Sequence, residues 1–437
     1  MTRIAQPVCR PLKVLVLSQY FPPEEVMIPS TLARVMGERG HNVRVLTGYP
    51  NYPTGEVYHG YKQRWRSMEN HGGVDVLRVP LWADHSQGPV KRIFNYLSFA
   101  FSAATARSFA RGADVIYVYA TQMTPAFAPW IWRLTGGRIP YVLHVQDLWP
   151  DSITGSSLVA GGLVSRAMDT VLGPWLRSVY RHASAVVGIA PTMVKTLVER
   201  GVDEGKALLV YNWAAEQGPA EGEASATGPA ERGTGARILY AGNVGDMQDL
   251  ETAVWAAHAA RDAEVHLTIL GDGIALPRVR ELAESLGADN VDFLPRVPRE
   301  KMGDLYREAD FALVTLKDLP VFRGTVPSKL QASLARGVPV ITSVQGDVRE
   351  IVESLGVGLT ADAESVDSLA AAFRAAGSIT SEARVAMAAR ARDAYQSRFS
   401  QSAAIAALER ILAEASRQRE SAQASRNRRS VSRVVVD

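Results

Sequence analysis

The chain has little cysteine and no long apolar run, and both absences exclude classes of protein. Cys9 is the only cysteine among 437 residues, which excludes an intramolecular disulfide framework and a thiolate metal cluster. The longest nearly apolar stretch, residues 94–104, is far too short to span a bilayer. The first residues contain no long apolar segment of the kind that directs secretion. We therefore expect a cytoplasmic protein that is not embedded in a membrane.

Histidine is also scarce, and charge of one sign does not dominate. None of the eight histidines is spaced with carboxylates at zinc-type intervals, so we expect no metal and no cofactor. The net charge is only +3, but it divides into +8 over residues 1–212 and −9 over residues 213–416. A basic first half suits anionic lipid or a diphosphate-bearing substrate, and random surface variation explains it equally well. We expect no nucleic-acid partner.

Apolar runs alternate with helical segments along most of the chain, which is 47% hydrophobic and long enough for two cores. This alternation predicts α/β structure with two doubly wound, Rossmann-like domains, at residues 13–213 and 236–392. The expected strands cover residues 13–18, 42–47, 76–80, 114–119, 141–145 and 185–190, then 237–241, 265–270, 291–294, 311–316 and 338–342.

Segments outside these domains differ in composition. Residues 214–235 are rich in Ala, Gly, Glu and Pro, which predicts a disordered linker or insert. A C-terminal helical segment covers residues 393–415, with Ser402 as an N-cap, and the Arg/Ser-rich tail 416–437 is expected to be unstructured. Residues 91–101 are apolar and aromatic with basic flanks. Such a helix usually packs on the sheet, and the alternative is peripheral contact with the inner face of the cell membrane.

Residues 325–341 combine a loop, a short helix and a strand. Pro327 suits the first helical position, and Gly337 ends the helix. Ser328 and Lys329 would then lie where a parallel strand leads into a helix N-terminus, a corner that attracts phosphate through free N–H groups and the helix dipole. A capped helix with a solvated lysine is the structural alternative.

Loops of both domains follow predicted parallel strands, so we expect them at the carboxyl edges of the sheets, facing one cleft. They comprise residues 20–23, 50–53 and 146–152 of the first domain, and residues 242–245, 271–273, 296–297 and 326–329 of the second.

Six motifs in these loops, in this order, resemble those of the retaining GT4-type glycosyltransferases of GT-B fold, in particular the fucosamine-transferase-like branch that assembles O-antigen, capsule and exopolysaccharide. The matching segments are Gln-Tyr-Phe-Pro-Pro at 19–23, residues 40–55, Asp-Leu-Trp-Pro-Asp-Ser at 147–152, Tyr-Ala-Gly-Asn-Val-Gly at 240–245, Leu-Gly-Asp-Gly at 270–273, and Pro-Ser-Lys-Leu at 327–330 with Gly-Val-Pro-Val-Ile at 337–341.

The resemblance implies roles for individual residues. The second domain would bind the donor diphosphate, ribose and base through Gly242, Asn243, Gly245, Gly271, Asp272, Arg296, Val297, Ser328 and Lys329. The first domain would bind the acceptor through Tyr20, Asn51, Tyr52 and Trp149, with Asp147, Gln146 and His144 as catalytic candidates. The segment 393–415 would cross back onto the first domain.

Three departures from the family pattern leave alternatives open. Gly324 and Ala332 occupy the positions of two common glutamates, Gln146 replaces a common histidine, and the glycine pair after Pro22-Pro23 is absent. The expected function is transfer of a sugar, with retention, from a nucleotide donor, favouring UDP, to a glycan or polyprenyl-diphosphate acceptor. A nucleotide-sugar-binding pseudoenzyme and a sugar-nucleotide epimerase are the alternatives.

Overall fold

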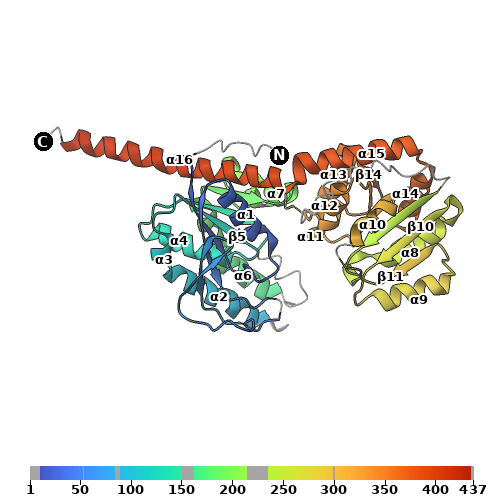
Figure 1. Cartoon of the computed structure of the whole chain (residues 1–437), viewed down its shortest axis with the longest axis horizontal. Helices are drawn as coiled ribbons and strands as arrows, with labels where there is room; N and C mark the ends of the chain where they lie inside the picture. Colours follow the sequence, from blue (N-terminus) through green and yellow to red (C-terminus); the bar gives the residue numbers. More distant parts are fainter. Residues whose placement is uncertain are drawn as a thin grey trace. The chain divides into compact units, whose positions relative to one another are not determined.

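The computed structural model describes residues 10–52, 54–83, 89–149, 162–213, 235–298 and 301–434. The chain divides into two compact units, each a sheet with helices packed around it (Figure 1). The first comprises Met1–Ile189, Met193–Val210 and Ile405–Asp437, and the second Ala190–Thr192 and Tyr211–Ala404. Some predicted features lie outside the described residues: Cys9, Pro53, Pro150, Asp151, Ser152 and the insert 214–235 apart from Gly235.

The first unit contains an eight-stranded sheet of order β3-β4-β2-β1-β5-β6-β7-β8. Its neighbours pair in parallel except β3 and β4. The strands are β1 (Lys13–Ser18), β2 (Asn42–Gly48), β3 (Ser67–His71), β4 (Val74–Val79), β5 (Val115–Ala120), β6 (Tyr141–Val145), β7 (Ala185–Gly188) and β8 (Ala207–Leu209). The helices are α1 (Met27–Glu38), α2 (Pro89–Thr105), α3 (Arg107–Ala110), η1 (Thr124–Ala126), α4 (Phe127–Leu134), α6 (Gly162–His182), α7 (Pro191–Glu199) and η2 (Glu204–Lys206).

The second unit contains a six-stranded parallel sheet of order β11-β10-β9-β12-β13-β14. The strands are β9 (Ala236–Ala241), β10 (Val265–Leu270), β11 (Val291–Leu294), β12 (Phe311–Val314), β13 (Val340–Thr342) and β14 (Gly358–Thr360). The helices are η3 (Asp246–Gln248), α8 (Leu250–Ala259), η4 (Arg261–Ala263), α9 (Leu276–Leu286), α10 (Met302–Glu308), α11 (Pro320–Arg323), α12 (Ser328–Ala335), α13 (Asp347–Leu355), α14 (Val366–Ser378), α15 (Ser381–Ala394) and the π-helical turn η6 (Tyr395–Phe399).

The prediction of two doubly wound α/β sheets is confirmed, and each predicted strand is present. Three strands escaped prediction: β3, β8 and β14. β3 is polar and largely exposed, and β8 and β14 have three residues each. The apolar pattern of all three is too weak to predict a strand. They are strands because they pair with a neighbouring strand, and their own sequences do not favour this conformation strongly.

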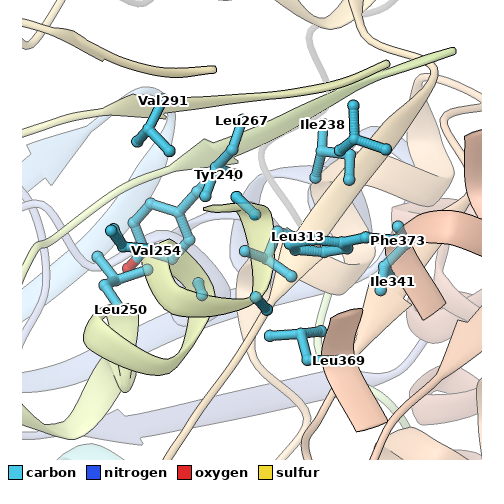
Figure 2. Packing of buried hydrophobic residues seen from close by; sticks show 14 of the residues in the cluster. Ile238, Tyr240, Leu250, Val254, Leu267, Val291, Leu313, Ile341, Leu369 and Phe373 are labelled. Atoms are coloured by element: carbon cyan, nitrogen blue, oxygen red, sulfur yellow. The ribbon is translucent and has the colours of Figure 1, made fainter. Parts of the chain in front are cut away.

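A layer of buried side chains joins the second sheet to its helices. Tyr240 and Leu267 from the strands pack with Leu250 and Val254 of α8, and Phe373 of α14 packs beside Leu313 and Ile341 (Figure 2). Tyr240 is fully buried. This packing fixes the carboxyl end of β9, from which the first donor-side loop departs.

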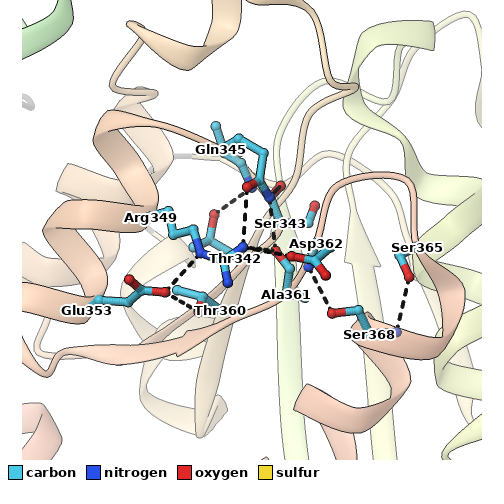
Figure 3. A network of polar contacts seen from close by, with 11 residues as sticks. Thr342, Ser343, Gln345, Arg349, Glu353, Thr360, Ala361, Asp362, Ser365 and Ser368 are labelled. Carbon is cyan, nitrogen blue, oxygen red and sulfur yellow. Dashed lines mark hydrogen bonds and ion pairs between the residues drawn. The ribbon is translucent and has the colours of Figure 1, made fainter.

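A polar network holds the edge strand β14. Arg349 of α13 donates to Glu353 and to Asp362, each at 2.9 Å, and Thr360 donates to Glu353 at 2.8 Å (Figure 3). Ser365 caps α14 by accepting from the Ser368 N–H. These bonds compensate for the three-residue length of β14.

Helix α2 partly fits the expectation that it packs on the sheet. Phe99, Ala100 and Ala103 are buried, whereas Phe94 and Phe101 are about 60% exposed. Within the described part of the chain, no helix combines the length and the apolar character needed to cross a bilayer.

The last helix, α16 (Gln401–Val434), corrects two predictions. It continues through most of the tail that was expected to be unstructured from residue 416. Its part up to residue 420 contacts the first sheet's loops, since Arg419 donates to the carbonyl of Ala113 at 3.0 Å and Glu420 pairs with Arg10. Ser400, not Ser402, caps its start by accepting from the Ala403 N–H.

Glu409 connects α16 to the loop after α1. It accepts from Arg39 at 2.6 Å and from His41 Nε2 at 3.0 Å, while His41 Nδ1 accepts from the Leu12 N–H. Burial raises the pKa of Glu409, but the hydrogen bonds from His41 and Arg39 outweigh this effect and hold the pKa below its ordinary value. The ionised carboxylate therefore stabilises the first unit above about pH 4.5, and this contribution is lost as the pH falls further.

Replacing Glu409 with alanine is expected to lower the free energy of unfolding of the first unit by roughly 1–3 kcal/mol, because the buried His41 and the partly buried Arg39 lose their acceptor. Urea unfolding measures the change. Glu414→Ala is the control, since Glu414 is exposed on the same helix, where it accepts from Arg417 and Gln418. Equal losses for the two variants would contradict the assigned role of Glu409.

Candidate functional site

Both sheets have a point at which consecutive connections leave in opposite directions. In the second sheet β9 lies between β10 and β12, and in the first sheet β1 lies between β2 and β5. Open α/β sheets bind ligands at the carboxyl ends of strands beside such a switch point. The candidate ligand-binding loops are therefore those after β9 and β12 in the second unit, and those after β1 and β5 in the first.

Lys329 is the charged group at the switch point of the second unit. It lies in the first turn of α12, and its Nζ donates to the Tyr240 hydroxyl at 2.7 Å and lies 4.3 Å from the centre of that ring. Burial lowers the pKa of Lys329 to about 8. Within the described residues it has no carboxylate in ion-pair distance. A half-buried cation without an anionic partner is costly, and it is what an anion site requires.

Two glycines let the backbone pass close to this lysine. Gly242 and Gly271 both have φ of +145°. A Cβ on Gly242 would lie 2.5 Å from Lys329 Cε, and a Cβ on Gly271 would lie 1.9 Å from the carbonyl oxygen of Gly242. The Gly242 N–H donates to the Leu270 carbonyl. Both predicted positions thus need glycine for a steric reason, whatever they bind.

The loop after Gly242 is held by Gln248, which motif reading did not single out. Its Oε1 accepts from Asn243 Nδ2 at 3.2 Å and from the Gly245 N–H at 3.0 Å. The Tyr240 hydroxyl donates to the carbonyl of Asn243. Tyr240 thus joins Lys329 to this loop. The sequence signal for this role was the position of Tyr240 near the end of a strand, two residues before Gly242.

The remaining predicted donor residues are more scattered. Ser328 is exposed and is the first residue of α12, with Pro327 at the N-cap rather than at the first helical position. Asp272 is exposed and accepts from the Gly273 N–H, and Arg296 is exposed. Val297 packs against a cluster of buried side chains that includes Leu239, Leu270 and Tyr306. Among the described residues, no hydrogen bond or ion pair joins Asp272 or Arg296 to Lys329.

The positions of the two common glutamates supply no carboxylate. Gly324 follows α11, and Ala332 is partly buried within α12. The nearby acid on this loop, Asp318, is held by Arg323 at 2.8 Å. Its hydrogen bond with Arg323 lowers the pKa of Asp318.

In the first unit, buried amide side chains meet at the switch point. Gln19 follows β1 and donates to Asn95 of α2 at 2.6 Å, and Gln122 follows β5 and donates to Gln19. Asn95 donates to Asn51 at 3.4 Å. Of these four residues, sequence analysis gave a role only to Asn51. Gln19 lay in a matching motif without an assigned role, and Asn95 and Gln122 were not singled out. Asn51 is fully buried, so its side chain orders this loop rather than facing solvent.

Glu24 connects two of the predicted acceptor loops, residues 20–23 and 50–53, by hydrogen bonds to both. Its carboxylate accepts from the N–H groups of Phe21, Asn51 and Tyr52 at 2.8 to 3.1 Å. Burial raises the pKa of Glu24, although these hydrogen bonds and Arg78 oppose the effect. Glu24 lies in the segment after Pro22-Pro23 where the family's glycine pair is absent. This departure from the family pattern could have pointed to Glu24, but sequence analysis did not use it.

His144 lies inside the sheet rather than at its edge. It is fully buried, and its Nδ1 shares a 2.6 Å hydrogen bond with the Tyr117 hydroxyl. Burial lowers the pKa of His144 to about 3, so the ring is neutral. His144 thus lies on a central strand with no exposed surface, and its catalytic role stays a prediction.

Asp147 lies at the carboxyl end of β6 and is exposed. Burial by neighbouring atoms nevertheless raises the pKa of its carboxyl, and its negative charge adds to the burial that raises the pKa of Tyr119. No described residue donates a hydrogen bond to it. The residues that a turn cap here would hold, 150–152, lie outside the described part of the chain, so the turn cap and a ligand-facing carboxylate both stay open as roles of Asp147.

The other predicted acceptor residues are mostly buried. Gln146, Tyr20 and Trp149 have 8% or less of their surface exposed, whereas Tyr52 is 44% exposed. The rings of Tyr20 and Tyr52 lie 5.4 Å apart. Asp147 and Tyr52 are thus the two predicted acceptor-side residues that present their side chains to solvent.

Comparison with known families now identifies the chain. A glycosyl transferase 4-like domain model matches residues 29–213, and a glycosyl transferases group 1 model matches residues 225–394. The chain belongs to the GT4-type glycosyltransferases. The resemblance of its motifs to this family is thereby confirmed, as is glycosyltransferase activity as the class of function.

Individual relatives agree with this family. The chain is 28% identical over 386 residues to WcaI of Escherichia coli K12, whose name assigns it provisionally to colanic acid biosynthesis as a glycosyl transferase; the match covers 84% of this chain and 92% of WcaI. Sucrose-phosphate synthase of Thermosynechococcus elongatus has a TM-score of 0.63 at 17% identity, over 92% of this chain and 98% of that one. HepE of Anabaena in complex with UDP has a TM-score of 0.59 at 15% identity, and the match covers 92% of this chain and 99% of HepE. These structural likenesses show the GT-B fold of this GT4-type glycosyltransferase.

Proposed function

We propose that the chain transfers a sugar, with retention of configuration, from a UDP-sugar to a glycan or polyprenyl-diphosphate-linked acceptor in the synthesis of a surface polysaccharide. The second unit binds the donor and the first binds the acceptor. The observation that carries the proposal is Lys329, a half-buried ammonium group that has no acidic partner among the described residues and lies beside two glycines at a helix N-terminus. Such a corner suits a diphosphate.

The relatives support the choice of donor and pathway. HepE was solved with UDP, and WcaI is named for colanic acid biosynthesis. A nucleoside diphosphate requires cationic and N–H donors, and this loop offers Lys329 with the N-terminus of α12. We extend both properties to this chain as parts of the proposal.

Lys329 also supports catalysis without a metal. The diphosphate gains negative charge as it leaves the sugar, and a positioned cation stabilises that charge in the transition state. Ser328, at the first position of α12, adds a hydroxyl donor. We therefore propose that no divalent ion is required.

Asp147 is the proposed acceptor-side group. Its carboxylate orients or deprotonates the acceptor hydroxyl, or stabilises positive charge at the sugar ring. The raised pKa of Asp147 brings its basicity closer to neutral pH than that of an ordinary carboxylate.

Helix α2 supports delivery of a lipid-linked acceptor at a membrane surface. Four residues of α2 recur at helical spacing and are exposed, so they form one apolar face on the proposed acceptor unit: Ile93, Phe94, Leu97 and Phe101. We propose peripheral contact of this face with the inner side of the cell membrane.

The test uses the purified full chain with a panel of UDP- and GDP-sugars, with and without polyprenyl-diphosphate acceptors, and with and without EDTA. We expect transfer only when a UDP-sugar and an acceptor are both present, no effect of EDTA, and retained anomeric configuration by NMR. Binding without turnover would instead show a pseudoenzyme, which the missing carboxylates at Gly324 and Ala332 would explain. Conversion of the sugar without an acceptor would show an epimerase.

A further inference from the structure

Four arginines line one cavity of about 510 Å³ in the first unit. Arg107 and Arg111 come from α3 and the turn after it, Arg138 from the loop between α4 and β6, and Arg419 from α16. Three glycines, Gly112, Gly136 and Gly137, and Ile139 form the rest of its wall. Among the residues that the structure describes, no carboxylate lines this cavity.

The cavity lies away from the proposed acceptor residues. Arg111 precedes β5 and Arg138 precedes β6, whereas Gln122 and Asp147 follow those same strands. Strands of five and six residues separate the two edges by roughly 17–20 Å. A ligand in the cavity therefore does not overlap the carboxyl-edge site.

Two of the guanidinium groups are fixed by backbone carbonyls. Arg419 donates to Ala113 at 3.0 Å, and Arg107 donates to the carbonyl and hydroxyl oxygens of Thr135 at 3.2 to 3.4 Å. These bonds hold the side chains in place and leave their charges uncompensated. None of the four arginines has a carboxylate in ion-pair distance among the described residues.

The other two arginines have unused donors. Arg111 and Arg138 are exposed, and their side chains make no hydrogen bond or ion pair within the described residues. The acids nearest in sequence are already engaged, since Asp114 accepts from the Lys13 N–H and Glu420 pairs with Arg10. Like charges that converge without acids repel one another unless an anion joins them.

We propose that this cavity is a second binding site of the chain, for a phosphate-bearing anion, in which fixed Arg107 and Arg419 and free Arg111 and Arg138 each donate to phosphate oxygens. Guanidinium groups bind phosphate through paired N–H donors, and several of them match an anion that carries more than one negative charge. The phosphate belongs either to a soluble polyphosphate or to the headgroup of an anionic lipid. This site does not depend on the proposed donor and acceptor chemistry.

The soluble arm uses inorganic tripolyphosphate as the probe, titrated calorimetrically into the full chain with saturating UDP present to occupy the donor site. Arg111→Ala combined with Arg138→Ala is the test variant, because neither side chain supports the fold. Arg133→Ala combined with Arg417→Ala is the control, since it removes the same charge from exposed positions outside the cavity. We expect the test variant to weaken binding about ten- to a hundredfold and the control to change it by less than about twofold.

The lipid arm measures sedimentation of the same proteins with phosphatidylglycerol vesicles and with phosphatidylcholine vesicles. Loss of phosphatidylglycerol binding in the test variant alone identifies a lipid headgroup, and loss of tripolyphosphate binding alone identifies a soluble ligand. Equal effects of the two double variants in both arms, or no binding by the unmodified chain in either, would overturn the proposal. UDP affinity is measured throughout and is expected to stay unchanged, so failure here is separable from failure of the donor site.

Discussion

Replacing Lys329 with alanine is expected to lower the rate of sugar transfer about ten- to a hundredfold while the protein stays folded. The ammonium group is half-buried and has no acidic partner among the described residues. A charge-assisted contact with the departing diphosphate is worth roughly 1.5–3 kcal/mol, which corresponds to that loss of rate. Steady-state kinetics with the donor varied measures the effect, and thermal unfolding checks the fold. Tyr240 retains its hydrogen bond to Asn243, so the loop should remain ordered.

Lys301→Ala is the matched control, because Lys301 is an exposed lysine of the same unit and lies outside the candidate site. It should leave kcat/KM unchanged. Lys329→Arg keeps the positive charge but replaces the ammonium group with a planar guanidinium, so it should retain more of the rate than Lys329→Ala. Normal kcat/KM in Lys329→Ala would remove this residue from the mechanism.

The lowered pKa of Lys329 adds a pH dependence to this prediction. The ammonium form exists below a pH of about 8 and is lost as the pH rises through that value, so UDP should bind more weakly at pH 9 than at pH 7. Bound diphosphate favours the ammonium form and raises its pKa in the complex. Calorimetric titration of UDP at the two pH values tests this, and Lys329→Ala should lose the difference.

Replacing Asp147 with asparagine is expected to cause a large fall in kcat, about a hundredfold or more, with donor affinity and stability unchanged. The amide keeps a carbonyl acceptor but loses the charge and the basicity that the proposed role uses. Because burial raises the pKa of Asp147, the acid limb of the kcat profile should lie above the ordinary carboxyl range, and activity should fall as the pH drops through it. Rates at saturating donor and acceptor measure the effect.

Asp203 offers a control in which a carboxylate does cap a turn. It accepts from the Gly205 N–H at 3.0 Å, and Asp203→Asn should retain both stability and activity. Normal turnover in Asp147→Asn, together with lost stability in Asp147→Ala, would instead make Asp147 a cap. The acceptor-side chemistry would then have to be sought at His144, Gln146 or Asp151.

Much of the architecture and of the donor side could be predicted from sequence. Buried parallel strands are continuous apolar runs, so β1, β5 and β12 are visible in the sequence. Lys329 is also predictable, because a Pro-Ser-Lys corner between a strand and a helix is a local pattern. Local signals determined these features because each depends on residues close together in the chain.

The tertiary structure alone decided which loops meet and which side chains face solvent. Gln19 and Gln122 are 103 positions apart, and Lys329 and Tyr240 are 89 apart, so no local pattern pairs them. His144 and Asp147 are three residues apart and looked alike as polar groups near a strand end, yet one is fully buried and the other exposed. The physical reason is that strand order sets which loops become neighbours, and the end of the sheet sets where burial stops.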